Sequence, residues 1–123
     1  MKRVLIVDDA ATVRLYHRKI LTDAGLSVDE AVNGIEALEK AMQSPYDLYI
    51  VDINMPKMDG YTFVRTLRAD LSLMQSPAIM VSTESKEGDV VVAYMAGANG
   101  YIIKPAKPVE LTLLTRLLLG EPD

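Results

Sequence analysis

Four short runs of consecutive apolar residues divide the chain. They are rich in β-branched and aromatic side chains and cover residues 4–7, 48–51, 78–81 and 101–103. Positions that are apolar one after another suit strands that are buried on both faces of a parallel sheet. A weaker strand is predicted over residues 27–31, where polar residues interrupt the pattern and indicate an edge position.

The segments between these runs have apolar residues at helical spacing, which predicts amphipathic helices. The predicted stripes are Val13, Tyr16, Ile20, Leu21 and Ala24 in the first helix, Ile35, Leu38 and Met42 in the second, and Tyr61, Val64 and Leu67 in the third. Gly25 is a typical helix stop, and Asn33-Gly34 suits a strand-to-helix junction. Two further helices are predicted over residues 86–96 and 109–119.

Five strands that alternate with five helices predict an α/β fold, a parallel sheet with helices on both faces. A chain of 123 residues without repeats or low-complexity tracts fits one domain, residues 1–123. Because parallel strands of such folds place their carboxyl ends together, we expect the reactive site at those ends.

Composition excludes several classes of function. The net charge of −4 argues against a sequence-independent nucleic-acid binder, and the absence of cysteine excludes disulfides and thiolate chemistry. No apolar run is long enough for a signal peptide or for membrane insertion. We therefore expect a cytoplasmic protein, and an end at Asp123, directly after the last helix, predicts that no output domain is attached.

Reactive side chains stand where the predicted strands end. Asp8 and Asp9 close the first strand, Asp52 the third, Ser82 the fourth, and Lys104 the fifth. Three converging carboxylates repel one another unless a hard cation binds them, and Mg²⁺ is the favoured cation. A metal, an ammonium and a hydroxyl around one carboxylate suit phosphoryl transfer, so Asp52 is the candidate nucleophile.

These motifs resemble the response-regulator receiver domains, and most closely the family's single-domain chemotaxis members. The resemblance covers nearly the whole chain and is most specific in residues 52–60 and 97–105. It implies a flavodoxin-like, doubly wound five-stranded sheet in the order 2-1-3-4-5. It also implies that Asp52 is the phosphoacceptor.

The same resemblance implies roles for further residues. Asp8, Asp9 and Asp52 hold Mg²⁺, together with the backbone carbonyl of Asn54. Lys104 pairs with the phosphoryl oxygens, and the Lys104–Pro105 bond is expected to be cis.

Two further residues are expected to form the switch. Ser82 is the switch hydroxyl that moves toward the new phosphate, and Tyr101 is the aromatic residue that follows it. Asn54 and Glu84 are expected to tune hydrolysis of the acyl phosphate, giving a lifetime of seconds to minutes.

The implied function is a switch in a two-component pathway, in chemotaxis or a related process. A histidine kinase or a small phosphodonor phosphorylates it, and the surface of the fourth helix, fifth strand and fifth helix then binds a protein target. It is not an enzyme beyond its own phosphorylation and dephosphorylation. No direct nucleic-acid contact and no membrane insertion are expected.

Other functions remain open at this point. A phosphate sink or phosphorelay intermediate would have the same site without its own output. A phosphatase of the haloacid-dehalogenase type usually has a second acidic residue two positions after its nucleophile, where this chain has Asn54. A flavin carrier is disfavoured because Asp8-Asp9 would repel a phosphate. The sequence does not name the kinase, the target or the oligomeric state, and it leaves open whether the chain is a piece of a longer regulator.

A few features do not follow from the site. The last helix has two apolar stripes, one formed by Val109, Leu113 and Leu117 and the other by Leu111, Leu114 and Leu118. One of the two is expected to pack on the sheet and the other to be exposed. His17 has no motif around it, so a structural or surface role is expected. Three residues depart from the common pattern of the family. Ala106 replaces a frequent Phe, Pro108 suits the start of the last helix, and Thr83 is expected to narrow access to the site.

Overall fold

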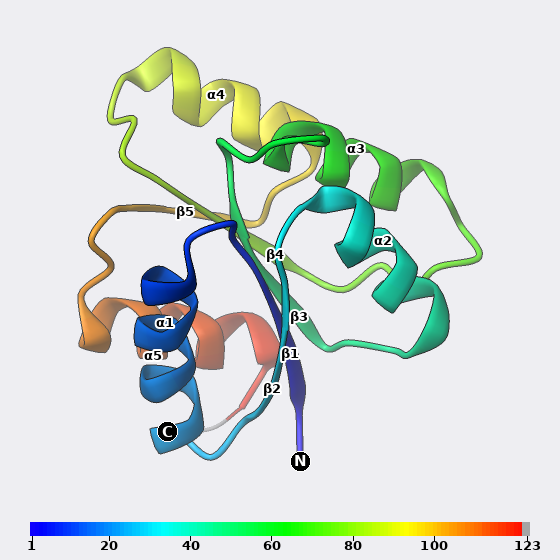
Figure 1. Ribbon diagram of the computed structural model, residues 1–123. Helices are drawn as coiled ribbons and strands as arrows, with labels where there is room; N and C mark the ends of the chain where they lie inside the picture. Colours follow the sequence, from blue (N-terminus) through cyan, green and yellow to red (C-terminus); the bar gives the residue numbers. More distant parts are fainter. Residues whose placement is uncertain (122–123) are drawn as a thin grey trace.

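The computed structural model, which describes residues 1–121, is a five-stranded parallel sheet between two layers of helices (Figure 1). The strands are β1 (Arg3–Val7), β2 (Ser27–Ala31), β3 (Leu48–Asp52), β4 (Ala78–Ser82) and β5 (Gly100–Ile103). The helices are α1 (Ala11–Asp23), α2 (Gly34–Gln43), α3 (Gly60–Ala69), α4 (Glu87–Ala96) and α5 (Pro108–Leu119). The sheet order is β2-β1-β3-β4-β5, as predicted, with β2 at one edge.

Strand residues alternate between two cores, as the period of two requires. In β1, Leu5 and Val7 face the core under α2, α3 and α4, whereas Val4 and Ile6 face the core under α1 and α5. This two-sided burial explains why the strands are apolar at consecutive positions.

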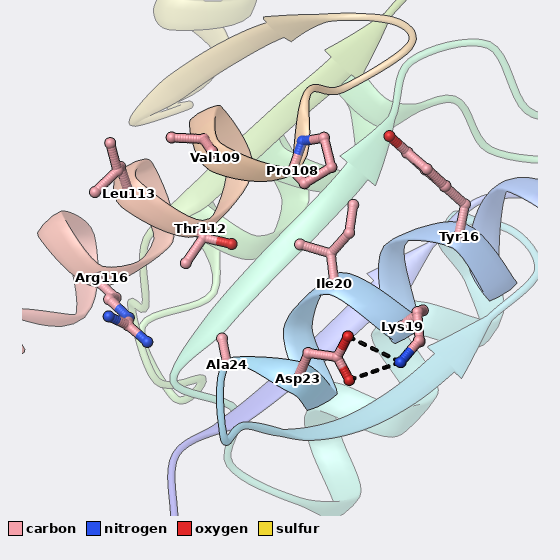
Figure 2. A pocket seen from close by; sticks show the side chains of 10 residues that line it. All are labelled: Tyr16, Lys19, Ile20, Asp23, Ala24, Pro108, Val109, Thr112, Leu113 and Arg116. Carbon is pink, nitrogen blue, oxygen red and sulfur yellow. Dashed lines mark hydrogen bonds and ion pairs between the residues drawn. The ribbon is translucent and has the colours of Figure 1, made fainter.

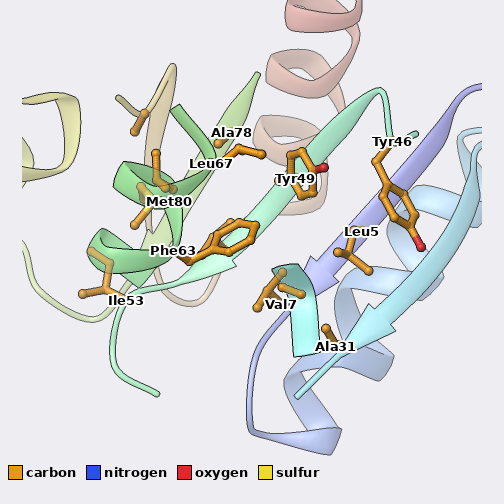
Figure 3. Close-up of a cluster of buried hydrophobic side chains, with 14 of the residues drawn as sticks. Leu5, Val7, Ala31, Tyr46, Tyr49, Ile53, Phe63, Leu67, Ala78 and Met80 are labelled. Carbon is orange, nitrogen blue, oxygen red and sulfur yellow. The ribbon is translucent and has the colours of Figure 1, made fainter. Parts of the chain in front are cut away.

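The larger aromatic side chains pack in the first of these cores (Figure 3). Tyr49 of β3 and Phe63 of α3 pack edge to face, with ring centroids 5.6 Å apart. Both side chains are fully buried, so they fix the distance between β3 and α3.

The second helix matches its predicted stripe only in part. Leu38 packs on the core as predicted, but Ile35 and Met42 are exposed, and Gly34 and Ala37 are buried. Gly34 lies directly against Met58, because a Cβ added there would come within 2.7 Å of Met58 Cγ. The predicted junction is present, because the Asn33 side chain accepts a hydrogen bond from the Glu36 N–H at 2.9 Å.

The first helix also differs in part from its predicted stripe. Ile20 and Leu21 are buried as expected, but Tyr16 is 41% exposed and His17 is buried instead. The helix ends where predicted, and Gly25 has a φ of 88°, a left-handed conformation that glycine adopts at little cost.

Candidate functional site

The carboxylates of three aspartates converge where β1 and β3 end. These strands are neighbours, and Val7 lies beside Val51 in the ladder, so Asp8 and Asp52 follow side by side. One oxygen of each of Asp8, Asp9 and Asp52 lies within 4.8 Å of the others. Asp8 and Asp52 are buried, whereas Asp9 is exposed, so the cluster opens to solvent on one side.

Lys104 brings a positive charge into this cluster from the far edge of the sheet. Its Nζ donates to Asp8 Oδ2 and to Asp52 Oδ1, both at 3.0 Å. The residue follows β5, and its backbone N–H donates to the carbonyl of Ser82 at 2.7 Å. The Lys104–Pro105 peptide bond is cis.

Burial and charge act against each other at this cluster. Burial raises the pKa of Asp52, and the nearby charges of Asp8 and Asp9 raise it further, although the hydrogen bond from Lys104 lowers it. Burial lowers the pKa of Lys104, but its hydrogen bonds with Asp52 and Asp8 outweigh that effect and raise it overall. One ammonium therefore does not neutralise the three carboxylates, and the cluster has room for a further cation.

The donor set fits a magnesium ion. All three groups are carboxylates, the hard oxygen ligands that Mg²⁺ prefers, and one of them faces solvent, which leaves space for the waters that Mg²⁺ retains. No nitrogen or sulfur ligand is part of the cluster within the described residues, so a soft metal has no preference for it.

The loop after β3 is held close to the end of that strand by a glycine. The Gly60 N–H donates to the Ile53 carbonyl at 2.8 Å, and a Cβ added at Gly60 would lie 2.3 Å from the Asp52 carbonyl oxygen. Only glycine allows this approach, which closes the loop that contains Asn54 over the end of the strand. The Asn54 side chain is exposed.

Ser82 and Tyr101 are connected through one backbone segment. The Glu84 N–H donates to Ser82 Oγ at 3.1 Å, and the Tyr101 hydroxyl donates to the Glu84 carbonyl at 2.7 Å. Ser82 is buried and Tyr101 is half-buried, while the side chains of Thr83 and Glu84 are exposed. A movement of Ser82 would therefore change the hydrogen bonds of the β4–α4 loop, against which Tyr101 rests.

Comparison with known proteins agrees with this geometry. The family model of the response regulator receiver domain matches residues 4–116 of this sequence. The chain belongs to this family. The prediction of a receiver domain similar to single-domain chemotaxis regulators is therefore confirmed.

The chain covers different shares of its individual relatives. The receiver domain is 38% identical to chemotaxis protein CheY-3 of Vibrio cholerae over 104 residues, which are 84% of this chain and 80% of that protein. It is 36% identical to the transcriptional regulatory protein ResD of Bacillus subtilis over 95% of this chain and 48% of that protein. The crystal structure of a response regulator from Chloroflexus aurantiacus superposes with a TM-score of 0.93 at 32% identity, covering 98% of each chain.

Two residues near the site, Arg14 and His17, have no functional role in the prediction from sequence. Arg14 donates through Nη1 to the Asp8 carbonyl at 2.8 Å. His17 is buried, and its Nδ1 has no hydrogen-bond partner among residues 1–121. An arginine in the first turns of the helix that follows Asp8-Asp9 was a visible signal for the first contact, because a helix packed on β1 brings this position back toward the strand end.

A second candidate surface lies on α4, β5 and α5. It has a set of exposed apolar side chains, namely Val91, Val92, Tyr94, Met95, Ile103, Val109, Leu113 and Leu117. In α5, Leu111 is fully buried and Leu114 and Leu118 pack on the core, so the predicted division of this helix into an inner and an outer stripe is confirmed. Pro108 occupies the first turn of α5, as predicted.

The outer stripe of α5 also borders a groove of about 510 Å³ between α1 and α5. Figure 2 shows Val109 and Leu113 on the α5 side of this groove and Ile20 on the α1 side. The Lys19–Asp23 ion pair and Arg116 lie at its margin.

None of the helices in residues 1–121 has the length and hydropathy of a membrane-spanning helix.

Proposed function

We propose that this receiver domain is a phosphorylation-activated switch whose phosphoacceptor is Asp52. The observation that supports this most directly is the pair of 3.0 Å contacts that join Lys104 to Asp52 and Asp8 at the ends of the strands. A histidine kinase is the proposed phosphodonor, and a small phosphodonor is the simplest laboratory substitute.

In the proposed reaction, an Asp52 carboxylate oxygen attacks the phosphorus of a phosphohistidine. The new O–P bond forms as the P–N bond breaks, and the leaving imidazole nitrogen keeps the bonding electron pair and takes up a proton from solvent. Lys104 exchanges its contact with Asp52 for contacts with the phosphoryl oxygens. Mg²⁺, held by Asp8, Asp9, Asp52 and the Asn54 carbonyl, would neutralise negative charge on those oxygens.

The switch follows from the connection between Ser82 and Tyr101. When the Ser82 hydroxyl turns toward the new phosphoryl group, it gives up the hydrogen bond from the Glu84 N–H. The β4–α4 loop then adopts a second arrangement in which Tyr101 moves inward. Phosphorylation shifts the balance between the two arrangements, because it stabilises only one of them.

The proposed output surface is the α4-β5-α5 face. Its exposed apolar side chains suit a protein target, since large exposed apolar patches on a protein surface mark interaction sites. Binding of nucleic acid or insertion into a membrane is not part of the proposal. The similarity to CheY-3 favours chemotaxis or a related two-component pathway.

A phosphate sink or relay intermediate is the second candidate, and its site would be identical. The exposed apolar residues of α4-β5-α5 favour a switch with its own target, because a sink needs no such surface. Phosphorylation-dependent capture of a target by this face would separate the two roles.

Asn54 and Glu84 are proposed to set the lifetime of the acyl phosphate. Both side chains are exposed beside the site, where they are able to guide a water toward the phosphorus. The expected lifetime is seconds to minutes, and an acyl phosphate that persists for many hours at neutral pH would contradict this role.

The test of the proposed function is the mass of the intact protein after incubation with acetyl phosphate, with and without Mg²⁺. We expect a gain of one phosphoryl group that requires Mg²⁺ and is absent from Asp52→Asn. Asp59→Asn is a matched control, because Asp59 caps α3 from an exposed position outside the cluster. Full phosphate uptake by Asp52→Asn would reject Asp52 as the acceptor.

A further inference from the structure

The peptide group between Asp8 and Asp9 is held by a side chain of α1. Arg14 Nη1 donates to the Asp8 carbonyl at 2.8 Å, and Arg14 Nε donates to Glu30 Oε1 at 2.8 Å. The Arg14 side chain is only 15% exposed, so both bonds are shielded from competition by water. One guanidinium thus connects β2 to the loop that follows β1.

Glu30 is held in turn by a second arginine. Arg18 Nε donates to Glu30 Oε2 at 2.6 Å, so each carboxylate oxygen of Glu30 faces a different guanidinium. Burial raises the pKa of Glu30, but hydrogen bonds from Arg18 and Arg14 lower it below its ordinary value overall. Glu30 therefore stays ionised and keeps the Arg14 fork in one orientation.

The Asp8 carbonyl matters because of the residue that follows it. The carbonyl of Asp8 and the N–H of Asp9 belong to one planar peptide group, so a fixed carbonyl direction fixes how the chain enters Asp9. Asp8 itself has other restraints: its N–H donates to the Ala31 carbonyl at 3.0 Å, and its Oδ1 accepts from the Ala10 N–H at 2.8 Å. Asp9 is exposed, and its orientation depends more strongly on this peptide group.

We propose that Arg14 is a positioning residue that keeps Asp9 directed toward the cation site, and that Glu30 orients Arg14 for this task. This inference rests on the proposed function, because it assumes that Asp8, Asp9 and Asp52 bind Mg²⁺. Residues that orient metal ligands typically change metal affinity by about 10- to 100-fold when they are replaced. We expect a weakening near the lower end of this range, since Asp8 keeps its other restraints.

The experiment compares Arg14→Met with Arg18→Met. Both variants lose one guanidinium bond to Glu30, but only Arg14 contacts the Asp8 carbonyl. The dissociation constant for Mg²⁺ is measured by isothermal titration calorimetry on the full chain without phosphodonor, and the thermal midpoint of each variant is recorded beside it. We expect Mg²⁺ binding to weaken roughly tenfold in Arg14→Met and by less than about twofold in Arg18→Met.

The initial rate of phosphorylation by acetyl phosphate provides a second measurement. Arg14→Met should need roughly tenfold more Mg²⁺ for half-maximal rate yet reach a rate near that of the unchanged protein at saturating Mg²⁺. Arg14→Lys retains one donor for the Asp8 carbonyl but cannot hold Glu30 in the same fork. Its Mg²⁺ requirement should therefore lie between those of Arg14→Met and the unchanged protein. It replaces Arg14→Met in the experiment if Arg14→Met does not fold.

Several results would overturn the inference. Equal Mg²⁺ affinity in Arg14→Met and the unchanged protein would show that the carbonyl contact does not position the site. Equal weakening in both arginine variants would assign the effect to the Glu30 ion pairs instead. A protein that does not bind Mg²⁺ at all before any substitution would contradict the proposed function itself, which is a separate and recognisable failure.

Discussion

The strand-end cluster and the α4-β5-α5 face differ in how their side chains are satisfied. In the cluster, Asp8 and Asp52 are buried and share the Lys104 ammonium, so each of these two carboxylates has a defined partner within the protein. On the face, Met95 is 82% exposed and Leu117 is 73% exposed, and the side chains contact solvent. The side chains of the first region are held by contacts within the described part of the protein, whereas the exposed side chains of the second have no such contacts there and are available to a partner.

This difference explains why the chemistry of the receiver domain is easier to infer than its target. Phosphoryl transfer requires particular charged groups at particular strand ends, and few arrangements satisfy that requirement. A docking face requires only exposed apolar area of suitable shape, which many partners are able to cover. Substitutions of one side chain in each region should therefore affect different properties, namely the stability of the domain and its binding of a target.

The largest expected effect on stability is at Lys104. Lys104→Met leaves the buried Asp8 and Asp52 carboxylates without their cation, and we expect a loss of about 4 kcal/mol in the free energy of unfolding at pH 7 without Mg²⁺. The measurement is urea denaturation. Lys107→Met, which alters an exposed lysine three residues away, should change stability by no more than about 0.5 kcal/mol. Equal losses in the two variants would show that the cluster tolerates its carboxylates unpaired.

The second largest expected change in stability distinguishes the inner stripe of α5 from its outer stripe. Leu111→Ala should lower the free energy of unfolding by about 3 kcal/mol, because Leu111 is fully buried in the core. Leu113→Ala should change it by no more than about 0.5 kcal/mol, because Leu113 is 56% exposed. Urea denaturation of both variants measures the difference.

A substitution at Leu113 also tests whether α5 binds a protein target. Leu113→Asp should leave phosphorylation of Asp52 unchanged while it weakens capture of any phosphorylation-dependent target. A large loss of stability in the Leu113 variants would instead mean that the outer stripe serves folding.

The limits of prediction from sequence also follow the division between the two regions. The meeting of Asp8, Asp52 and Lys104 could be predicted because each residue stands at the end of an apolar strand, and the sheet order was implied by the resemblance to receiver domains. The stripe of α2 could be predicted only in part, because Leu38 packs on the core but the buried Gly34 and Ala37 are small and carry little hydrophobic signal. The contact of Arg14 with the Asp8 carbonyl depends on the packing of α1 on β1, which periodicity does not describe.

His17 shows the same limit and gives the smallest predicted effect. The residue is a polar member of a helix with no motif around it, but the structure buries it beneath the Lys104–Pro105 segment, where it borders a small pocket. Burial lowers its pKa below the ordinary value of 6.5; the charge of Asp8 raises it and that of Lys104 lowers it by smaller amounts. The folded protein therefore holds His17 neutral at a pH where the unfolded chain already binds a proton.

The sign of the resulting pH dependence follows from proton linkage. The stabilising contribution of neutral His17 is fully present above pH 6.5, the ordinary pKa, and is lost as the pH falls through the lowered pKa of the folded state. Relative to the unchanged protein, His17→Gln should lose less stability on acidification below neutral pH, because glutamine does not titrate. Urea denaturation of both proteins over a series of pH values gives this difference directly. Parallel curves would mean that His17 titrates alike in the folded and unfolded states, and would contradict the prediction.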